Sequence, residues 1–353
     1  MKVDSRDPAP TSVDPAEAQG ESSPERQASS VRAEEVPAPP RPRTPPRARR
    51  RKLSRAREEA VAGLVFVSPF VIGFLVFTLG PLIYSFYLSF TSYDVLNPPI
   101  FIGSTNYARM LTDGMLRKAL SNTFIYGILY VPLSIVTALG VAMILNTGIK
   151  GLSFWRTAFY MPHLTPTVAA SVLWLRILSP QNGLLNRFLA LFGIRGPAWT
   201  VDADWVKPAL VIMRLWDVGW IMVVYMAALK NVPTELYEAA WVDGANGRQR
   251  FRHVTLPMIS GVVFFTTIML TIFSLQIFTE AYVMFPVQGS QSRQAGPQNS
   301  ALFYVYYLFQ QAFAYFRMGY ASALAWVLFA ITLVITAIQL RGSRRLVYTE
   351  ASK

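Results

Sequence analysis

The chain has 353 residues, of which 52% are hydrophobic and 15% are charged, and its mean hydropathy is +0.32. This composition excludes an ordinary soluble domain and is typical of a polytopic membrane protein. The sequence contains no cysteine, which excludes disulfides and thiolate metal sites. Its two histidines, His163 and His253, are too far apart in the chain for a zinc-binding spacing. We therefore expect no metal site.

Residues 1–59 form a tail rich in Pro, Ser, Ala, Glu and Arg, with few large apolar residues. Such a segment cannot bury enough surface to offset its ordering entropy, so we expect it to be disordered. It ends in a run with nine basic residues and no acidic one, Arg41 to Arg57, directly before the first apolar segment. One interpretation of this run is binding to nucleic acid or to a regulatory partner. We favour the other, contact with anionic lipid at the cytoplasmic face of a membrane, and expect no nucleic-acid partner.

Six apolar segments follow, each near the ~20 helical residues that cross a bilayer. They are Val61–Phe90, Leu120–Leu145, Ala158–Leu178, Val206–Leu229, Ile259–Phe285 and Tyr320–Leu340. The fold class expected is all-α, a polytopic membrane protein with six transmembrane helices over residues 60–345 and a short tail at 346–353. Lys and Arg are more frequent on the side of the membrane that holds both termini. By the positive-inside bias, both termini then face the cytoplasm of a multi-pass cell-membrane protein.

A polar, charge-bearing segment, residues 231–257, separates the fourth and fifth apolar segments. Pro233 and Glu235 suit the first turn of a helix, where a missing N–H costs nothing and an acidic group complements the helix dipole. Gly244 and Gly247 can end or bend that helix. The segment predicts a short helix, a glycine turn and a second, basic helix at the membrane surface. This arrangement suits the docking of another protein rather than catalysis.

The same segment carries a family pattern, EAA-x-x-DGA-x-x-x-x-x-F-x-x-V-x-LP. Its defining residues are Glu238, Ala239, Ala240, Asp243, Gly244, Ala245, Leu256 and Pro257. The pattern resembles the EAA loop of the membrane subunits of ATP-binding-cassette importers, in the branch that takes up maltose, glycerol 3-phosphate and similar solutes. In that family the segment is the coupling helix that sits in a groove of the ATPase subunit.

The resemblance extends over most of residues 60–345. It includes Ser68-Pro69-Phe70, Phe101-Ile102-Gly103, Asn106-Tyr107 and Met318-Gly319-Tyr320-Ala321-Ser322-Ala323. One departure follows the fifth apolar segment, where the family often has a Gly-Gly-Pro run and this chain reads PVQGSQSRQAGPQ. The shape of that outer loop is therefore left open.

The resemblance implies a type I importer permease that pairs with a second, related permease chain. It also implies two copies of an ATPase subunit, which would bind ATP and Mg, and an extracytoplasmic solute-binding protein. This chain itself contains no G-x-x-x-x-G-K-[ST] phosphate loop, no G-x-S-x-G and no H-E-x-x-H. We therefore expect a transport subunit without enzyme activity or a cofactor of its own.

Polar side chains inside apolar segments are costly and are functional-site hypotheses by default. Those concerned are Arg214, Asp217 and Trp220 in the fourth segment and Gln276, Glu280 and Tyr282 in the fifth. Arg214 and Asp217, three residues apart, can pair on one helix face, either to neutralise each other or to line a translocation pathway. Aromatic rings beside amide and carboxylate groups suit a polyhydroxylated solute, although the same rings at helical spacing also serve interhelical packing.

Two further features each admit two interpretations. His163, between Pro162 and Pro166, is either a pH-sensitive group or a polar residue at a proline-kinked helix start, and we favour the latter. A proton-coupled secondary carrier would typically show several embedded acids and an inverted repeat. Here the embedded acids are essentially Asp217 and Glu280, and no repeat is visible, so the importer subunit is the interpretation we favour.

Overall fold

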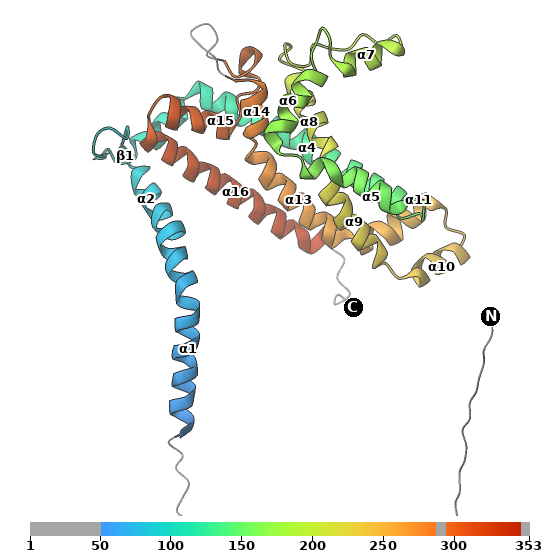
Figure 1. The fold of residues 1–353 in the computed structure, drawn as a ribbon, viewed down its shortest axis with the longest axis horizontal. Helices are drawn as coiled ribbons and strands as arrows, with labels where there is room; N and C mark the ends of the chain where they lie inside the picture. The colour runs from blue at the N-terminus through green and yellow to red at the C-terminus, as the bar shows by residue number, and fades with distance from the viewer. Residues whose placement is uncertain (1–50, 287–293, 347–353) are drawn as a thin grey trace, which may run out of the picture. The chain divides into compact units, whose positions relative to one another are not determined.

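The computed structural model describes residues 51–286 and 294–346, which are mostly helical (Figure 1). The chain divides into two units, Met1–Phe66 and Val67–Lys353. In the first unit the described residues, 51–66, all belong to helix α1 (Arg51–Phe74). Residues 1–50 of the expected tail, and the short tail from 347 onward, lie outside the described residues.

Helix α1 begins inside the segment that we expected to be disordered. Residues 51–59, RKLSRAREE, are helical, although the expected tail extends to residue 59. Arg, Lys, Leu, Ala and Glu have high helix propensities, and the apolar segment that follows lets the helix continue without a break. The boundary expected from composition is therefore several residues too late.

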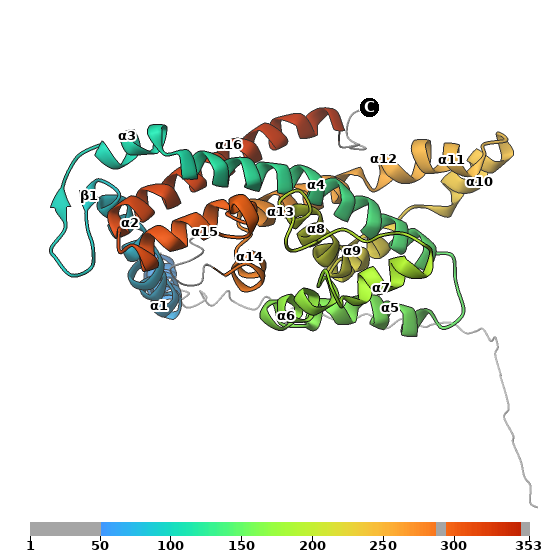
Figure 2. The same cartoon turned by 90° about the horizontal axis from the view of Figure 1, so that it is seen from above.

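The second unit is built from helices with one small β-hairpin (Figure 2). Its elements are the end of α1, the π-helix Leu75–Leu79, α2 (Gly80–Leu88), β1 (Thr91–Ser92), β2 (Ile100–Phe101), α3 (Thr105–Thr112), α4 (Gly114–Leu145), α5 (Leu152–Tyr160), the 3₁₀ turn Met161–Leu164, α6 (Thr167–Ile177), α7 (Leu184–Leu191), α8 (Val206–Trp216), α9 (Gly219–Lys230), α10 (Thr234–Val242), α11 (Gly247–Arg250), the π-helix Phe251–Thr255, α12 (Leu256–Met258), α13 (Ser260–Leu275), α14 (Thr279–Met284), the 3₁₀ turn Pro297–Asn299, α15 (Tyr304–Phe309), the π-helix Gln310–Ala314 and α16 (Met318–Leu346). Helix α4 is central: it packs against α8, α9, α13 and α15.

Four helices of the described ranges are long and apolar enough to cross a bilayer, namely Arg57–Leu88, Gly114–Leu145, Ser260–Met284 and Met318–Gly342. Helices α8 and α9, which meet at 53°, qualify together as a fifth, bent span. The expected span Ala158–Leu178 is not one helix, because α6 has only 11 residues and a 3₁₀ turn precedes it. Pro162 and Pro166 account for this break, since proline lacks the N–H that a helix interior needs. Six spans therefore remain a prediction.

The hairpin after α2 is held in place by two residues of the family pattern, Asn106 and Gly319. β1 and β2 pair antiparallel, with Thr91 opposite Phe101. The buried amide of Asn106 donates to the carbonyls of Ser89 and Thr91, at 2.9 Å each. Gly319 lies so close to the carbonyl of Thr91 that a Cβ at this position would overlap it. These contacts fix the hairpin against the start of α16.

Asp113 joins three elements at the start of α4. Its Oδ1 accepts hydrogen bonds from the backbone N–H groups of Met115 and Leu116, which caps the helix. Its Oδ2 accepts the hydroxyls of Tyr307 in α15, at 2.5 Å, and Tyr320 in α16, at 2.6 Å. Partial burial raises the pKa of Asp113, but these four donors together outweigh it and hold the pKa below its ordinary value.

Replacing Asp113 by alanine should lower the thermal unfolding midpoint of the detergent-solubilised chain by several degrees. The change removes a helix cap, worth about 1 kcal/mol, and leaves two tyrosine hydroxyls without their acceptor. Because the pKa of Asp113 is depressed, its stabilising contribution is present above about pH 3.9 and is lost as the pH falls through the lowered value. The stability advantage of the wild type over Asp113→Asn should therefore be constant above about pH 5 and shrink as the pH falls below about 3.9. An advantage that does not change with pH would contradict this account.

Candidate functional site

Three helix breaks lie around one cavity in the second unit. The first break is the 3₁₀ turn Met161–Leu164 between α5 and α6. The second lies between α8 and α9, at Asp217 and Val218, and the third at residues 276–278, between α13 and α14. Helix α6 packs against α14, and α4 packs against α8, α9 and α13. Backbone that leaves the helical conformation at membrane depth is tolerated where it is buried in protein or lines a water-filled cavity.

The cavity between these breaks has a volume of about 320 Å³. It is lined by aromatic, amide, hydroxyl and charged side chains: Tyr130, His163, Thr167, Arg214, Asp217, Trp220, Phe273, Gln276, Ile277, Phe278, Thr279 and Glu280. This mixture of ring faces and hydrogen-bonding groups, within the size range of small-molecule sites, can bind a solute that carries many hydroxyls.

A cluster of four ionisable groups crosses the cavity wall. The Arg214 guanidinium contacts the Glu280 carboxylate and also donates to Asp217 Oδ2 at 3.3 Å. The other oxygen of Asp217 lies 2.9 Å from Nδ1 of His163. The side chain of Glu280 is only 2% exposed, whereas those of Arg214 and Asp217 are 28% and 24% exposed. Arg214 therefore compensates the charge of the Glu280 carboxylate, which has almost no contact with solvent. His163 faces Asp217, the less buried carboxylate.

The close packing of α9 against α5 depends on Gly219. A Cβ at Gly219, the first residue of α9, would overlap the carbonyl of Phe159 and the backbone of Tyr160. The absence of a side chain lets the start of α9 lie directly against the end of α5. This contact brings the break at Asp217 next to the turn that carries His163.

Most residues that the sequence singled out for a solute pathway meet at this cavity. Arg214, Asp217, Trp220, Gln276 and Glu280 all line it. Tyr282 does not: its ring stacks on Phe278 at 5.3 Å between centroids and packs edge-on against Tyr306 and Phe309. The expected span Ile259–Phe285 is interrupted between Gln276 and Glu280, because α13 ends at Leu275 and α14 begins at Thr279.

The sequence did not assign the other lining residues to the cavity, and Tyr130, Thr167 and His163 are the polar ones outside the fifth apolar segment. Tyr130 lies two residues before Pro132 in a long apolar helix and carries no signal of its own. His163 was interpreted as a polar residue at a kinked helix start, and the structure gives it a carboxylate partner in addition. The signal that could have found it is the pair Pro162 and Pro166, which implies non-helical backbone that must line protein or water.

The segment between α9 and α13 is a folded unit rather than an open loop. Helix α10 ends in a Schellman motif, with Gly244 N–H donating to Trp241 O and Ala245 N–H to Ala240 O. Gly244 has φ of +76°, a left-handed conformation that glycine adopts without strain. The pattern D-G-A therefore encodes the end of this helix.

The second half of the segment is capped and tied back to the first. Asn246 and Gln249 form a capping box at the start of α11, which runs into the π-helix Phe251–Thr255 and α12. The hydroxyls of Tyr237 and Thr255 lie 3.0 Å apart and link α10 to this second half. Pro233 takes the N-cap position of α10, one place before the first turn that the sequence suggested for it.

The surface of α10 exposes apolar side chains. Trp241 is 71% exposed and Val242 is 81% exposed. A hollow of about 330 Å³ adjoins them, lined by Ala240, Asp243, Gly244, Ala245, Gln249, Arg250, His253 and Val254. An exposed tryptophan and valine beside a hollow are features of a protein-docking surface. Of the pattern residues, Leu256 and Pro257 form the start of α12, while Glu238 and Ala239 are exposed on α10.

Among the residues that the structure describes, no group of three or more His, Asp or Glu side chains could hold a metal ion.

Breaking the Arg214–Glu280 pair from one side should cost more than removing both charges. Arg214→Gln leaves the buried Glu280 carboxylate uncompensated, a loss of about 3–5 kcal/mol in comparable buried pairs. The double variant Arg214→Gln/Glu280→Gln removes that charge and should recover much of the loss. Thermal unfolding of both variants in one detergent measures the difference, with Asp217→Asn as a milder control at a more exposed position. A double variant no more stable than Arg214→Gln would contradict the pairing.

Comparison with known proteins identifies the family of this chain. Residues 113–348 match the family model described as "Binding-protein-dependent transport system inner membrane component". The chain is 40% identical over 306 residues to a probable ABC transporter permease protein, YesP, of Bacillus subtilis (strain 168), covering 86% of this chain and 97% of that protein. It is 33% identical over 290 residues to the lactose transport system permease protein LacF of Rhizobium radiobacter, covering 80% and 94%.

A solved structure shares the fold. A chain of the bacterial alginate ABC transporter, crystallised with an alginate-bound periplasmic protein, superposes with a TM-score of 0.69 at 21% identity, covering 85% of this chain and 99% of that one. At this identity the likeness concerns the fold alone. The family match and the identity to curated permeases go further: this chain belongs to the inner membrane components of binding-protein-dependent transport systems, the permeases of ABC transporters.

Proposed function

We propose that this chain is the membrane-spanning subunit of an ATP-driven importer for a carbohydrate-type solute. It forms part of the translocation pathway around the cavity at Arg214 and Glu280. It couples that pathway to separate ATPase subunits through the segment 231–257. The observation that carries the proposal is the prefolded, exposed α10–α12 segment between two apolar helices, bearing the EAA pattern of this family.

The partners follow from that role. A second permease chain would complete the pathway, two ATPase subunits would bind α10 and its counterpart, and an extracytoplasmic binding protein would deliver the solute. The family description and the binding protein in the alginate transporter structure support the last of these. Exposed apolar side chains after residue 66, such as Phe70 (75%) and Phe77 (81%), are suited to lipid or to a second permease chain.

The membrane arrangement proposed is six spans in the cell membrane with both termini in the cytoplasm. In this arrangement α5 and α6 together form the sixth span, although neither helix is long enough to cross the bilayer alone. The distribution of Lys and Arg supports the orientation, because the segment 231–257 then faces the same side as the basic end of the N-terminal tail. ATP and Mg would be bound by the ATPase subunits, and the absence of a phosphate-loop pattern from the sequence supports this division.

A carbohydrate-type solute is supported by the cavity and by the relatives. Trp220, Phe273 and Tyr130 offer ring faces, and Gln276 and Thr279 offer hydrogen bonds that hydroxyl groups can satisfy. LacF, at 33% identity, is a lactose permease. We propose this class for the present chain.

Replacing Gly244 by tryptophan should abolish ATPase stimulation and uptake in the reconstituted importer while the chain still inserts. The new side chain would project at the docking surface and strain a left-handed backbone. Gly193→Trp is a matched control, because Gly193 also has φ of +72° and open space around it but lies outside the segment 231–257. The measurement is binding-protein-stimulated ATPase activity at equal abundance of both variants. Normal stimulation in Gly244→Trp would refute the coupling role.

Replacing Gln276 by alanine should change solute preference or apparent affinity without uncoupling the ATPase. Gln276 is exposed to the cavity at the break after α13, so its amide is free to bind a solute hydroxyl. Loss of one such bond costs about 0.5–1.5 kcal/mol, a change of roughly 2- to 12-fold in affinity. Uptake competition among neutral sugars, measured beside ATPase activity, tests this. Unchanged preference and affinity would place the solute elsewhere in the protein.

A further inference from the structure

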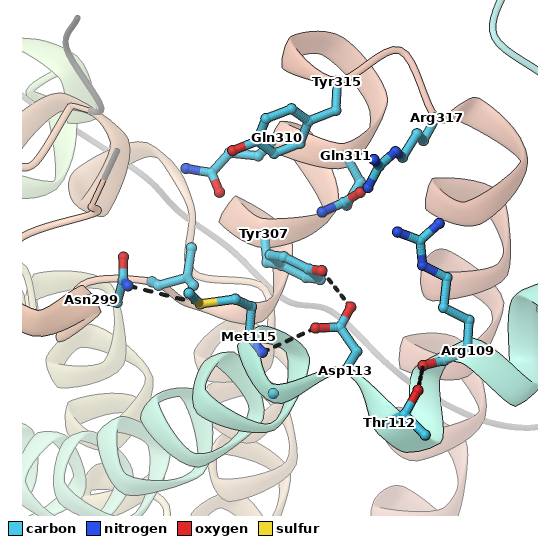
Figure 3. A pocket seen from close by; sticks show the side chains of 12 residues that line it. Arg109, Thr112, Asp113, Met115, Asn299, Tyr307, Gln310, Gln311, Tyr315 and Arg317 are labelled. Carbon is cyan, nitrogen blue, oxygen red and sulfur yellow. Dashed lines mark hydrogen bonds between the residues drawn. The ribbon is translucent and has the colours of Figure 1, made fainter. Parts of the chain in front are cut away.

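A second, larger cavity lies beside the first turn of α4, away from the charged cluster (Figure 3). Its volume is about 740 Å³, within the range of small-molecule sites. Its lining comes from the end of α3, the start of α4, α15, the π-helix Gln310–Ala314 and the turn before α16. In Figures 1 and 2 these elements lie at the opposite end of α4 from α10. With α10 in the cytoplasm, this cavity opens on the extracytoplasmic side.

Asp113 faces this cavity but has no capacity left for a ligand. Each of its carboxylate oxygens already accepts two hydrogen bonds, Oδ1 from backbone N–H groups and Oδ2 from Tyr307 and Tyr320. The carboxylate is therefore a structural acceptor that holds α4, α15 and α16 together. Any ligand must be recognised by the other side chains of the cavity.

Two arginines bring positive charge to the cavity. The guanidinium of Arg109 lies over the ring of Tyr320, 5.1 Å from its centroid, and that of Arg317 lies 5.9 Å from the ring centroid of Tyr315. Among the described residues, neither arginine forms an ion pair with a carboxylate. Stacking on a ring leaves the N–H donors at the edge of each guanidinium available. These donors suit the two oxygens of a carboxylate.

A buried acceptor without a partner lies beside the two arginines. Gln311 is 4% exposed, and its Oε1 has no hydrogen-bond partner in the structure. Buried acceptors are almost always satisfied, so one that lines a cavity points to a bound donor such as a hydroxyl group. Figure 3 shows the side chains of Arg109, Gln311 and Arg317 extending toward the same part of the cavity. Tyr315, which is 45% exposed, adds a ring at the rim.

We propose that this cavity is an extracytoplasmic binding site for an acidic carbohydrate. Arg109 and Arg317 take a uronic-acid carboxylate, Gln311 Oε1 accepts a sugar hydroxyl, and the ring of Tyr315 packs against a sugar face. The site would hold the solute before it reaches the cavity at Arg214. This deepens the proposed function, on which it rests for the route of the solute.

The test is direct binding of trigalacturonate to the purified full-length chain in phosphatidylcholine nanodiscs, measured by microscale thermophoresis. The wild type should bind trigalacturonate at least tenfold more tightly than the neutral trisaccharide maltotriose. Arg317→Gln and Gln311→Met should each weaken trigalacturonate binding at least tenfold. Arg187→Gln is the matched control, because Arg187 is an exposed arginine of α7 that does not line the cavity, and it should bind as the wild type does.

Three results would overturn the assignment. The first is that the chain binds both trisaccharides equally well or binds neither. The second is that Arg187→Gln weakens trigalacturonate binding as much as Arg317→Gln does. The third is that phosphatidylglycerol added to the nanodiscs displaces trigalacturonate, which would assign the cavity to a lipid headgroup. The assay contains no ATPase subunit, so its failure leaves the coupling role untouched. Conversely, normal ATPase stimulation in Gly244→Trp would refute coupling without affecting trigalacturonate binding.

Discussion

A bilayer offers no hydrogen bonds to a backbone that leaves the helix, and the second unit is organised around this constraint. Three apolar segments break, at the turn before α6, between α8 and α9, and between α13 and α14. The breaks do not face outward separately; they gather around a single polar cavity. Each of them frees backbone groups, and each also turns a polar side chain inward: His163, Asp217 and Gln276.

The charged cluster follows from the same arrangement. A carboxylate as buried as that of Glu280 would be strongly unfavourable alone, and the break between α8 and α9 brings Arg214 within reach of it. Asp217 and His163 then extend the network to the more exposed side. Close packing at Gly219 is part of this arrangement, because α9 could not begin beside α5 with a side chain there. Polar function and backbone geometry are therefore not independent in this bundle.

The elements that the sequence predicted well are those specified by neighbouring residues. The end of α10 at Gly244 depends on one left-handed glycine, and the start of α11 on Asn246 and Gln249, so local pattern suffices. Arg214, Asp217, Gln276 and Glu280 stand out because charge and amide groups are costly in apolar segments. The pairing of Arg214 with Glu280, the pairing of His163 with Asp217 and the packing of Tyr282 against Tyr306 join residues 24 to 66 positions apart, which no local pattern encodes. The apolar composition of Ala158–Leu178 predicts a continuous span, but Pro162 and Pro166 interrupt the helix there.

The Tyr237–Thr255 link has a consequence for how this chain meets another protein. Together with the Schellman motif and the capping box, it ties α10 to α12 into one folded segment within the chain itself. A surface that is ordered in advance loses little conformational entropy when it binds a partner. More of the free energy gained by burying exposed residues such as Trp241 would then contribute to the binding affinity. In the coupling role proposed for this segment, a displacement of α10 would pass into α9 and α13 as a movement of one body, without first being absorbed by a flexible connection.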